Sequence, residues 1–159
     1  MPDIRAHTYR PIPHESDAVY RCLADFVHGQ PRLLPHAVRD YEVRAGGFGE
    51  GTIVACAMTI RGRERKFLFR IAEPIRTRTI TGFDHGSHLT LTWFLRDAGP
   101  TTEVEIEAYW TEPDSTFAFL KAWWAYVVVR RLLNAMLDRI PAVIHELGYD
   151  RPSSAEAPR

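Results

Sequence analysis

The sequence predicts an α+β domain in which a curved antiparallel sheet of about seven strands wraps around one long C-terminal helix. Three observations carry this prediction: a first strand followed by two short helical segments, six later strands joined by short turns, and a long final helical pattern. The expected order is strand, helix, helix, six strands, helix. We expect residues 1–149 to form one ligand-binding domain and residues 150–159, rich in Pro, Ser and Ala, to be a disordered tail.

Size and composition are those of one globular domain. A chain of 159 residues can bury roughly 70% of its unfolded surface without a disulfide or a metal. Its formal net charge of zero argues against nucleic-acid binding, which depends on neutralising phosphates. Cys22 and Cys56 lie inside apolar patterns, where a free cysteine behaves as a small hydrophobe. With no apolar signal core and no apolar stretch long enough for a bilayer, we expect a reduced, cytoplasmic compartment.

The first third of the chain changes from strand to helix. Residues 4–12 read as a strand. Residues 19–27 carry apolar side chains at helical spacing, which predicts a helix with one buried face that Gly29 stops. Pro31 and Pro35 leave room for at most one further helical turn.

The middle of the chain has a period of two. Apolar and polar residues alternate in short runs separated by Gly, Pro and Asp, as in an antiparallel meander with one apolar face. The glycine-rich segment 45–51 leads into a strand and contains no lysine, so we interpret it as an inter-strand turn rather than a phosphate-binding loop. The six expected strands lie at residues 38–43, 52–60, 66–71, 77–83, 89–95 and 104–110.

The last segment is a helix that covers the apolar face of the sheet. Residues 113–115 suit a helix start, and the apolar residues from Leu120 to Leu147 follow the helical period. Pro141 removes one backbone hydrogen bond, so we expect a kink near Leu137. Gly148 is placed to cap the end.

The order of these elements and several local strings resemble the START-related superfamily (SRPBCC, the helix-grip fold). The similar strings are residues 12–20, 23–26, 34–35 with 41–43, 46–52 and 132–144. His14 and the string Gly29-Gln30-Pro31 depart from the family pattern. The resemblance implies the helix-grip fold and one of the family's activities, which include polyketide cyclases and dehydrases, lipid and coenzyme Q carriers, and ligand-binding plant allergens.

We expect the sheet and the final helix to leave an apolar cavity between them that binds a hydrophobic small molecule, aromatic, polyketide-like or lipid-like. The alternative that the resemblance implies is a polyketide cyclase, aromatase or dehydratase that uses cavity groups as general acid and base. The residues expected to contact the ligand are Phe67, Phe69, Leu91, Trp93, Ile106, Trp110, Leu120, Trp124, Val127 and Met136.

Polar candidates for catalysis are scattered rather than clustered in the sequence. Asn134 interrupts an apolar helical pattern, so it either faces the cavity and needs a partner, which a ligand could provide, or lies on the exposed side. The other candidates are His7, Tyr9, Tyr41, Thr79, Thr81 and Arg131.

We expect neither a metal nor a cofactor. His85 and His88 form a close pair with Asp84 beside them, but zinc sites need three or four ligands held by structure. The pattern predicts a turn at these residues.

The aromatic residues at the start of the final helix are too dense for one buried face. Trp123 and Trp124 diverge by about 100° around a helix, so part of this corner should be exposed. Phe117, Phe119 and Tyr126 belong to the same group. An exposed apolar corner around Trp123 predicts a ligand portal, a homodimer contact or a membrane-surface contact, the last as in a coenzyme Q- or membrane-associated interaction protein.

Overall fold

Seven strands form one antiparallel sheet in the computed structural model, which describes residues 3–60, 62–111 and 118–151. The strand order β1-β7-β6-β5-β4-β3-β2 places the first strand of the chain beside the last. The predicted α+β architecture is confirmed. The elements are β1 (Asp3–Ile12), α1 (Ser16–Ala24), α2 (Gly29–Leu33), β2 (Val38–Ala45), β3 (Ile53–Ile60), β4 (Arg63–Ile75), β5 (Thr79–Asp84), β6 (Leu89–Ala98), β7 (Thr101–Thr111) and α3 (Ala118–Leu147).

Alternation along each strand decides which side chains face inward. In β7, Val104, Ile106 and Ala108 are fully buried, while the glutamates between them are half-buried on the other face. Ile106 stands opposite Trp93 of β6 and Thr8 of β1, so the three strands contribute to one inner surface. Burying this surface against helices supplies the main driving force for folding.

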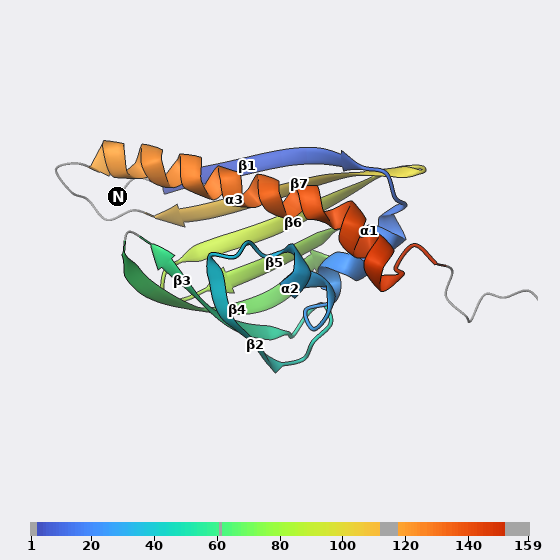
Figure 1. The fold of residues 1–159 in the computed structure, drawn as a ribbon, viewed down its shortest axis with the longest axis horizontal. Helices are drawn as coiled ribbons and strands as arrows, with labels where there is room; N and C mark the ends of the chain where they lie inside the picture. Colours follow the sequence, from blue (N-terminus) through green and yellow to red (C-terminus); the bar gives the residue numbers. More distant parts are fainter. Residues whose placement is uncertain (1–2, 61, 112–117, 152–159) are drawn as a thin grey trace, which may run out of the picture.

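The helices divide the concave side of the sheet between them. In Figure 1, α3 runs along β1 and β7, while α1 and α2 lie at the end where α3 finishes. The helix α3 packs mainly on β1 and α2. The helix α2 and the residues after it contribute Gln30 and Leu34 above the part of the sheet that α3 does not cover.

The helix α3 continues through Pro141 to Leu147. Its end is capped as predicted: Gly148 has a φ of 72°, and the backbone N–H of Tyr149 donates to the carbonyl of Ile144 at 3.1 Å. This pairing satisfies a carbonyl of the last turn that has no partner within the helix. The expected helix start at residues 113–115 and the aromatic Phe117 lie outside the described residues, as do tail residues 152–159.

The first helix is shorter than its apolar spacing predicts. α1 ends at Ala24, and Gly29 begins α2 instead of stopping α1. Asp25 is the reason, because its carboxylate accepts the backbone N–H groups of Val27 and His28 and turns the chain. Phe26 therefore points into the core, whereas Val27 is half exposed.

The glycine-rich segment is the turn between β2 and β3, as predicted. It also holds the end of α1 and the junction that follows, since the Gly47 carbonyl accepts the N–H of Phe26 and the Gly49 N–H donates to the carbonyl of Ala24. Across the parts of the chain that are described, no helix has the length and apolar character needed to cross a membrane.

Candidate functional site

A cavity of about 80 Å³ lies between the concave face of the sheet and the helices α2 and α3. It is almost wholly apolar. Several lining side chains, Phe69, Tyr41 and Leu91 among them, are only half-buried, so the cavity opens toward solvent. Its lining consists of Phe26, Gln30, Leu34, Tyr41, Val54, Cys56, Phe69, Ile71, Ile80, Gly82, Leu91, Trp93, Ile106 and Met136.

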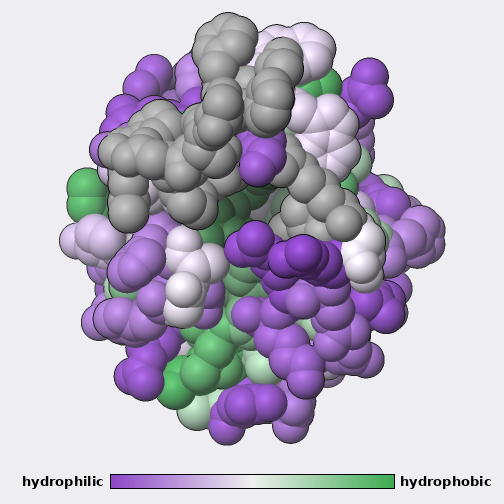
Figure 2. All heavy atoms as spheres, turned by 90° about the vertical axis from the view of Figure 1, so that its left-hand side faces the viewer, coloured by the Kyte–Doolittle hydropathy of each residue, from purple (hydrophilic) through white to green (hydrophobic). Residues whose placement is uncertain are grey.

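One end of the molecule exposes hydrophobic residues at its surface (Figure 2). In Figure 2, hydrophobic residues form a band that runs inward between two hydrophilic flanks. Gly82 lets two lining side chains pack closely on β5, because a Cβ at this position would meet Ile71 Cδ1 at 3.2 Å and Phe69 Cδ1 at 3.5 Å.

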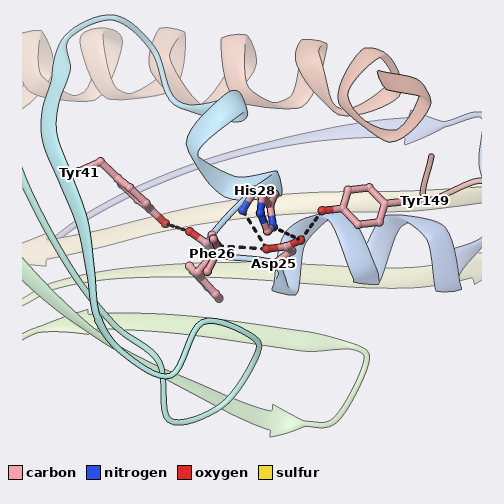
Figure 3. Close-up of polar contacts among 6 residues, drawn as sticks. Asp25, Phe26, His28, Tyr41 and Tyr149 are labelled. Carbon is pink, nitrogen blue, oxygen red and sulfur yellow. Dashed lines mark hydrogen bonds and ion pairs between the residues drawn. The ribbon is translucent and has the colours of Figure 1, made fainter. Parts of the chain in front are cut away.

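Three polar side chains line the cavity: Gln30, Tyr41 and Cys56. The Tyr41 hydroxyl donates to the backbone oxygen of Phe26 at 2.6 Å (Figure 3), and burial raises the pKa of this phenol well above its ordinary value. Burial, with a smaller contribution from Asp84, raises the pKa of the Cys56 thiol to about 11. Both groups are therefore neutral at pH 7.

A hydrogen-bonded hub around Asp25 holds the cavity wall in place. Figure 3 shows the Tyr149 hydroxyl, which donates to Asp25 at 2.5 Å, on the other side of this hub from Tyr41. Burial alone raises the pKa of Asp25, but the hydrogen bonds from Tyr149, His28 and Val27 outweigh it and lower that pKa. The hub joins the α1–α2 junction to the end of α3, so the backbone that carries Phe26 and Gln30 is fixed.

Asp84 is a buried carboxylate on the concave side of β5, 4% exposed, and it serves the β5–β6 turn. Its oxygens accept from the Ser87 hydroxyl at 2.6 Å and from the Leu68 N–H at 2.9 Å. Burial raises its pKa, yet these bonds prevail and the pKa is lowered. The turn at residues 85–88 is as predicted, and within the described ranges no three His, Cys, Asp or Glu side chains gather as metal ligands.

The candidates on the first strand do not face the cavity. His7 and Tyr9 lie on the outer face of the sheet, where the Tyr9 hydroxyl donates to Glu103 at 3.1 Å and His7 lies 3.6 Å from Glu105. The inward positions of β1 are the even ones, with Ala6 and Ile12 fully buried. His7 and Tyr9, which the sequence suggested as cavity groups, therefore lie on the face of the sheet opposite the cavity.

The threonines of β5 also point away from the cavity. Ile80 and Gly82 line it, so Thr79 and Thr81, which alternate with them, lie on the other face. Thr81 shares a hydrogen bond with Thr92 at 3.3 Å across β5 and β6. Arg131 is exposed on α3. Of the seven polar candidates, Tyr41 lines the cavity.

Asn134 has a protein partner instead of a ligand. It lies half-buried on the side of α3 that faces β1, and its Oδ1 accepts the Thr8 hydroxyl at 2.5 Å. An ion pair between Arg10 and Asp138 joins the same two elements one turn further along. These contacts attach α3 to the edge strand, which explains the polar residue in an otherwise apolar pattern.

Half of the expected ligand contacts lie at the cavity. Phe69, Leu91, Trp93, Ile106 and Met136 line it. Phe67 is on the same face of β4 and stacks on Phe69, but does not line the cavity. Three further residues do not line the cavity either. Trp110 packs against the hydrophobic core, Val127 is half-buried on α3, and Trp124 is 43% exposed. The side chain of Leu120, like that of Phe119, lies outside the described residues.

Sequence reasoning missed the lining from α2 and the irregular chain around it, in particular Phe26, Gln30 and Leu34. The one available signal was the string Gly29-Gln30-Pro31, in which a polar residue stands between a glycine and a proline. On β3, β4 and β5 the alternation predicts apolar faces, and the inward residues there are Val54, Cys56, Ile71 and Ile80.

The architecture defines the class: the chain has the helix-grip fold of START-related proteins. No family model and no curated protein matches the sequence. Among solved structures, the chain is similar to the KanY protein, at 23% identity over 91% of this chain and 99% of that one, with a TM-score of 0.80.

Two further solved structures have the same fold. One is a START superfamily protein from Mycobacterium smegmatis, at 11% identity over 90% of this chain and 98% of that one, with a TM-score of 0.68. The other is the Zhui aromatase/cyclase from Streptomyces sp. R1128, at 17% identity over 99% of this chain and 100% of that one, with a TM-score of 0.59. At these identities the likeness establishes the fold.

Proposed function

We propose that the protein binds a hydrophobic small molecule in the cavity between its sheet and the helices α2 and α3. The single observation that carries the proposal is the lining, in which residues from six strands and both helices surround open space. Most of these residues are apolar, and the polar ones are Gln30, Tyr41 and Cys56. Concave apolar sites with a few convergent polar groups are the usual form of small-molecule sites. The fold neighbours, which include an aromatase/cyclase, agree with such a role.

The size of the cavity limits how much of a ligand it encloses. Its volume of about 80 Å³ is well below the roughly 300–1,000 Å³ of pockets that enclose drug-sized molecules. Because the cavity opens to solvent, a ligand can insert one ring or chain end and leave the remainder at the mouth. Met136 lines the cavity, and its flexible thioether chain can move to admit a larger group.

Binding accounts for the site better than acid–base catalysis does. A cyclase needs cavity groups that exchange protons near neutral pH. Among the described lining residues, none is an acid, a histidine, a lysine or an arginine, and the pKa values of Tyr41 and Cys56 are raised away from neutrality. Turnover of a polyketide-like substrate that Tyr41→Phe abolished would favour the enzyme.

Gly82→Leu should weaken binding of 2-methoxynaphthalene at least tenfold, because the new side chain projects from β5 into the cavity that Gly82 lines. Calorimetric titration measures the affinity, and circular dichroism checks the fold. Arg70→Leu, which adds a leucine on the exposed outer face of the neighbouring strand, is the matched control and should bind as the wild type does. Equal affinity in Gly82→Leu and Arg70→Leu contradicts a ligand site in this cavity.

A second proposal concerns the exposed side of α3, which we infer to be a contact surface for anionic membranes. Trp123 is 61% exposed, and Arg130 and Arg131 are exposed two turns further along the helix. Between residues 118 and 137 the helix carries cations but no acidic side chain. Exposed tryptophan combined with positive charge suits a surface of negatively charged lipids.

Trp123→Ser should reduce co-sedimentation with phosphatidylglycerol vesicles several-fold, since the indole no longer inserts at the lipid boundary. Ile75→Ser, which removes an exposed hydrophobe 59% accessible on another surface, is the matched control and should leave it unchanged. Wild-type protein that ignores anionic vesicles defeats the proposal. So does a dimer that Trp123→Ser dissociates in the absence of lipid, which would assign the surface to a second copy of the chain.

A further inference from the structure

The amide of Gln30 is held in one orientation at the cavity wall. The side chain is 6% exposed, and its Nε2 donates to the backbone oxygen of Leu23 at 2.8 Å. That carbonyl belongs to the last turn of α1, where helical carbonyls lack partners within the helix. Only the nitrogen of the amide can donate to it, so Oε1 is turned away from α1.

The Oε1 atom of Gln30 meets open space rather than a protein donor. It has no hydrogen-bond partner among the residues that the structure describes. Among all the described residues, Arg21 Nε is the only fully buried side-chain nitrogen or oxygen without a hydrogen-bond partner. Gln30 Oε1 is therefore not fully buried, and it is in contact with open space. Gln30 is 6% exposed and lines the cavity, so we assign this space to the cavity.

The other polar atoms of the lining favour the same kind of ligand group. Tyr41 uses its proton on Phe26, which leaves its oxygen as a second acceptor. No described lining residue carries a positive charge. A carboxylate or phosphate would lose its water here without gaining a cationic partner, whereas a hydroxyl or N–H would satisfy a buried acceptor.

Building on the proposed function, we infer that the cavity selects neutral hydroxylated aromatic molecules, whose hydroxyl donates to Gln30 Oε1. The aromatic part would contact Phe26, Phe69 and Trp93, which line the same space. Gln30 is thereby a specificity-determining residue, and it discriminates an aromatic alcohol from both its ether and the acid of similar shape.

The test compares 2-naphthol, 2-methoxynaphthalene and 2-naphthoate by calorimetric titration at pH 7. These probes share one ring system and differ in the group offered to Gln30. We expect 2-naphthol to bind about tenfold more tightly than the ether, the factor that one hydrogen bond to a buried neutral acceptor contributes, and 2-naphthoate to bind most weakly. In Gln30→Met, which keeps the length of the side chain without Oε1, the preference should fall to within about twofold while the ether keeps its affinity.

Three results would overturn the role of Gln30: equal affinity of naphthol and ether in the wild type, tighter binding of naphthoate, or an unchanged preference in Gln30→Met. If Gln30→Met does not fold, the side-chain amide resonance of Gln30 in the wild type decides. It should shift on adding 2-naphthol and not the ether, and equal shifts overturn the inference. Failure of every probe to bind the wild type, or binding insensitive to Gly82→Leu, refutes the proposed function instead.

Discussion

Leu137→Ala is expected to lower the free energy of unfolding by about 3 kcal/mol. Leu137 is fully buried in the cluster of apolar side chains between α3 and the sheet. Truncation removes its burial and leaves a void that close-packed neighbours fill only in part. For a domain of this size the melting temperature should fall by roughly 6–12 °C. Urea denaturation followed by circular dichroism measures the change.

Arg131→Ala is the control for this variant, because Arg131 lies on the exposed side of the same helix. Its free energy of unfolding should stay within about 0.5 kcal/mol of the wild type. A cost below about 1 kcal/mol for Leu137→Ala would mean that α3 does not pack on the sheet through this residue.

Gly29→Ala is the second change with a large expected effect, a loss of about 3 kcal/mol in the free energy of unfolding. A Cβ at residue 29 would lie 2.2 Å from the backbone oxygen of Cys22. The obstructing atom belongs to the backbone of α1, so no side-chain rotation relieves the clash and α2 must move. Since Gln30 follows directly, the same variant should also weaken binding of 2-naphthol in the calorimetric titration.

Gly86→Ala is the matched control. Its Cβ would lie 3.6 Å from Asp84 Oδ2, an ordinary contact, and residue 86 does not have a positive φ. We expect its free energy of unfolding to change by less than about 0.5 kcal/mol. Equal costs for the two glycines would contradict the close approach of α1 and α2.

Much of the fold could be predicted because local patterns report it. The glutamates that alternate with Val104, Ile106 and Ala108 predict a half-buried strand, and β7 is one. Gly148 caps α3 because the left-handed conformation it adopts there strongly favours glycine. By contrast, the spacing of apolar residues predicts a first helix that includes Phe26 and Val27, whereas α1 ends at Ala24. The side chain of Asp25 breaks the helix before them, and its partner Tyr149 comes from the far end of the chain.

The polar candidates of the site show where local pattern fails. Neighbouring residues of a strand lie on opposite faces of the sheet. Because Ala6 and Ile12 are buried, Thr8 must face inward and His7 outward. Asn134 was expected either to face the cavity or to lie in solvent. Its actual partner, Thr8, is 126 residues away, so only the packing of α3 on β1 could reveal it.

The sequence by itself determined the order of strands and helices and the apolar inner face of the sheet, because both follow from interactions between residues close in the chain. Tertiary structure alone decided which polar atoms border the cavity. Gln30 acquires its role when the carbonyl of Leu23, on another helix, accepts its amide N–H, while its oxygen has no partner among the described residues. Such an assignment depends on contacts between elements, and no residue pattern along one element encodes it.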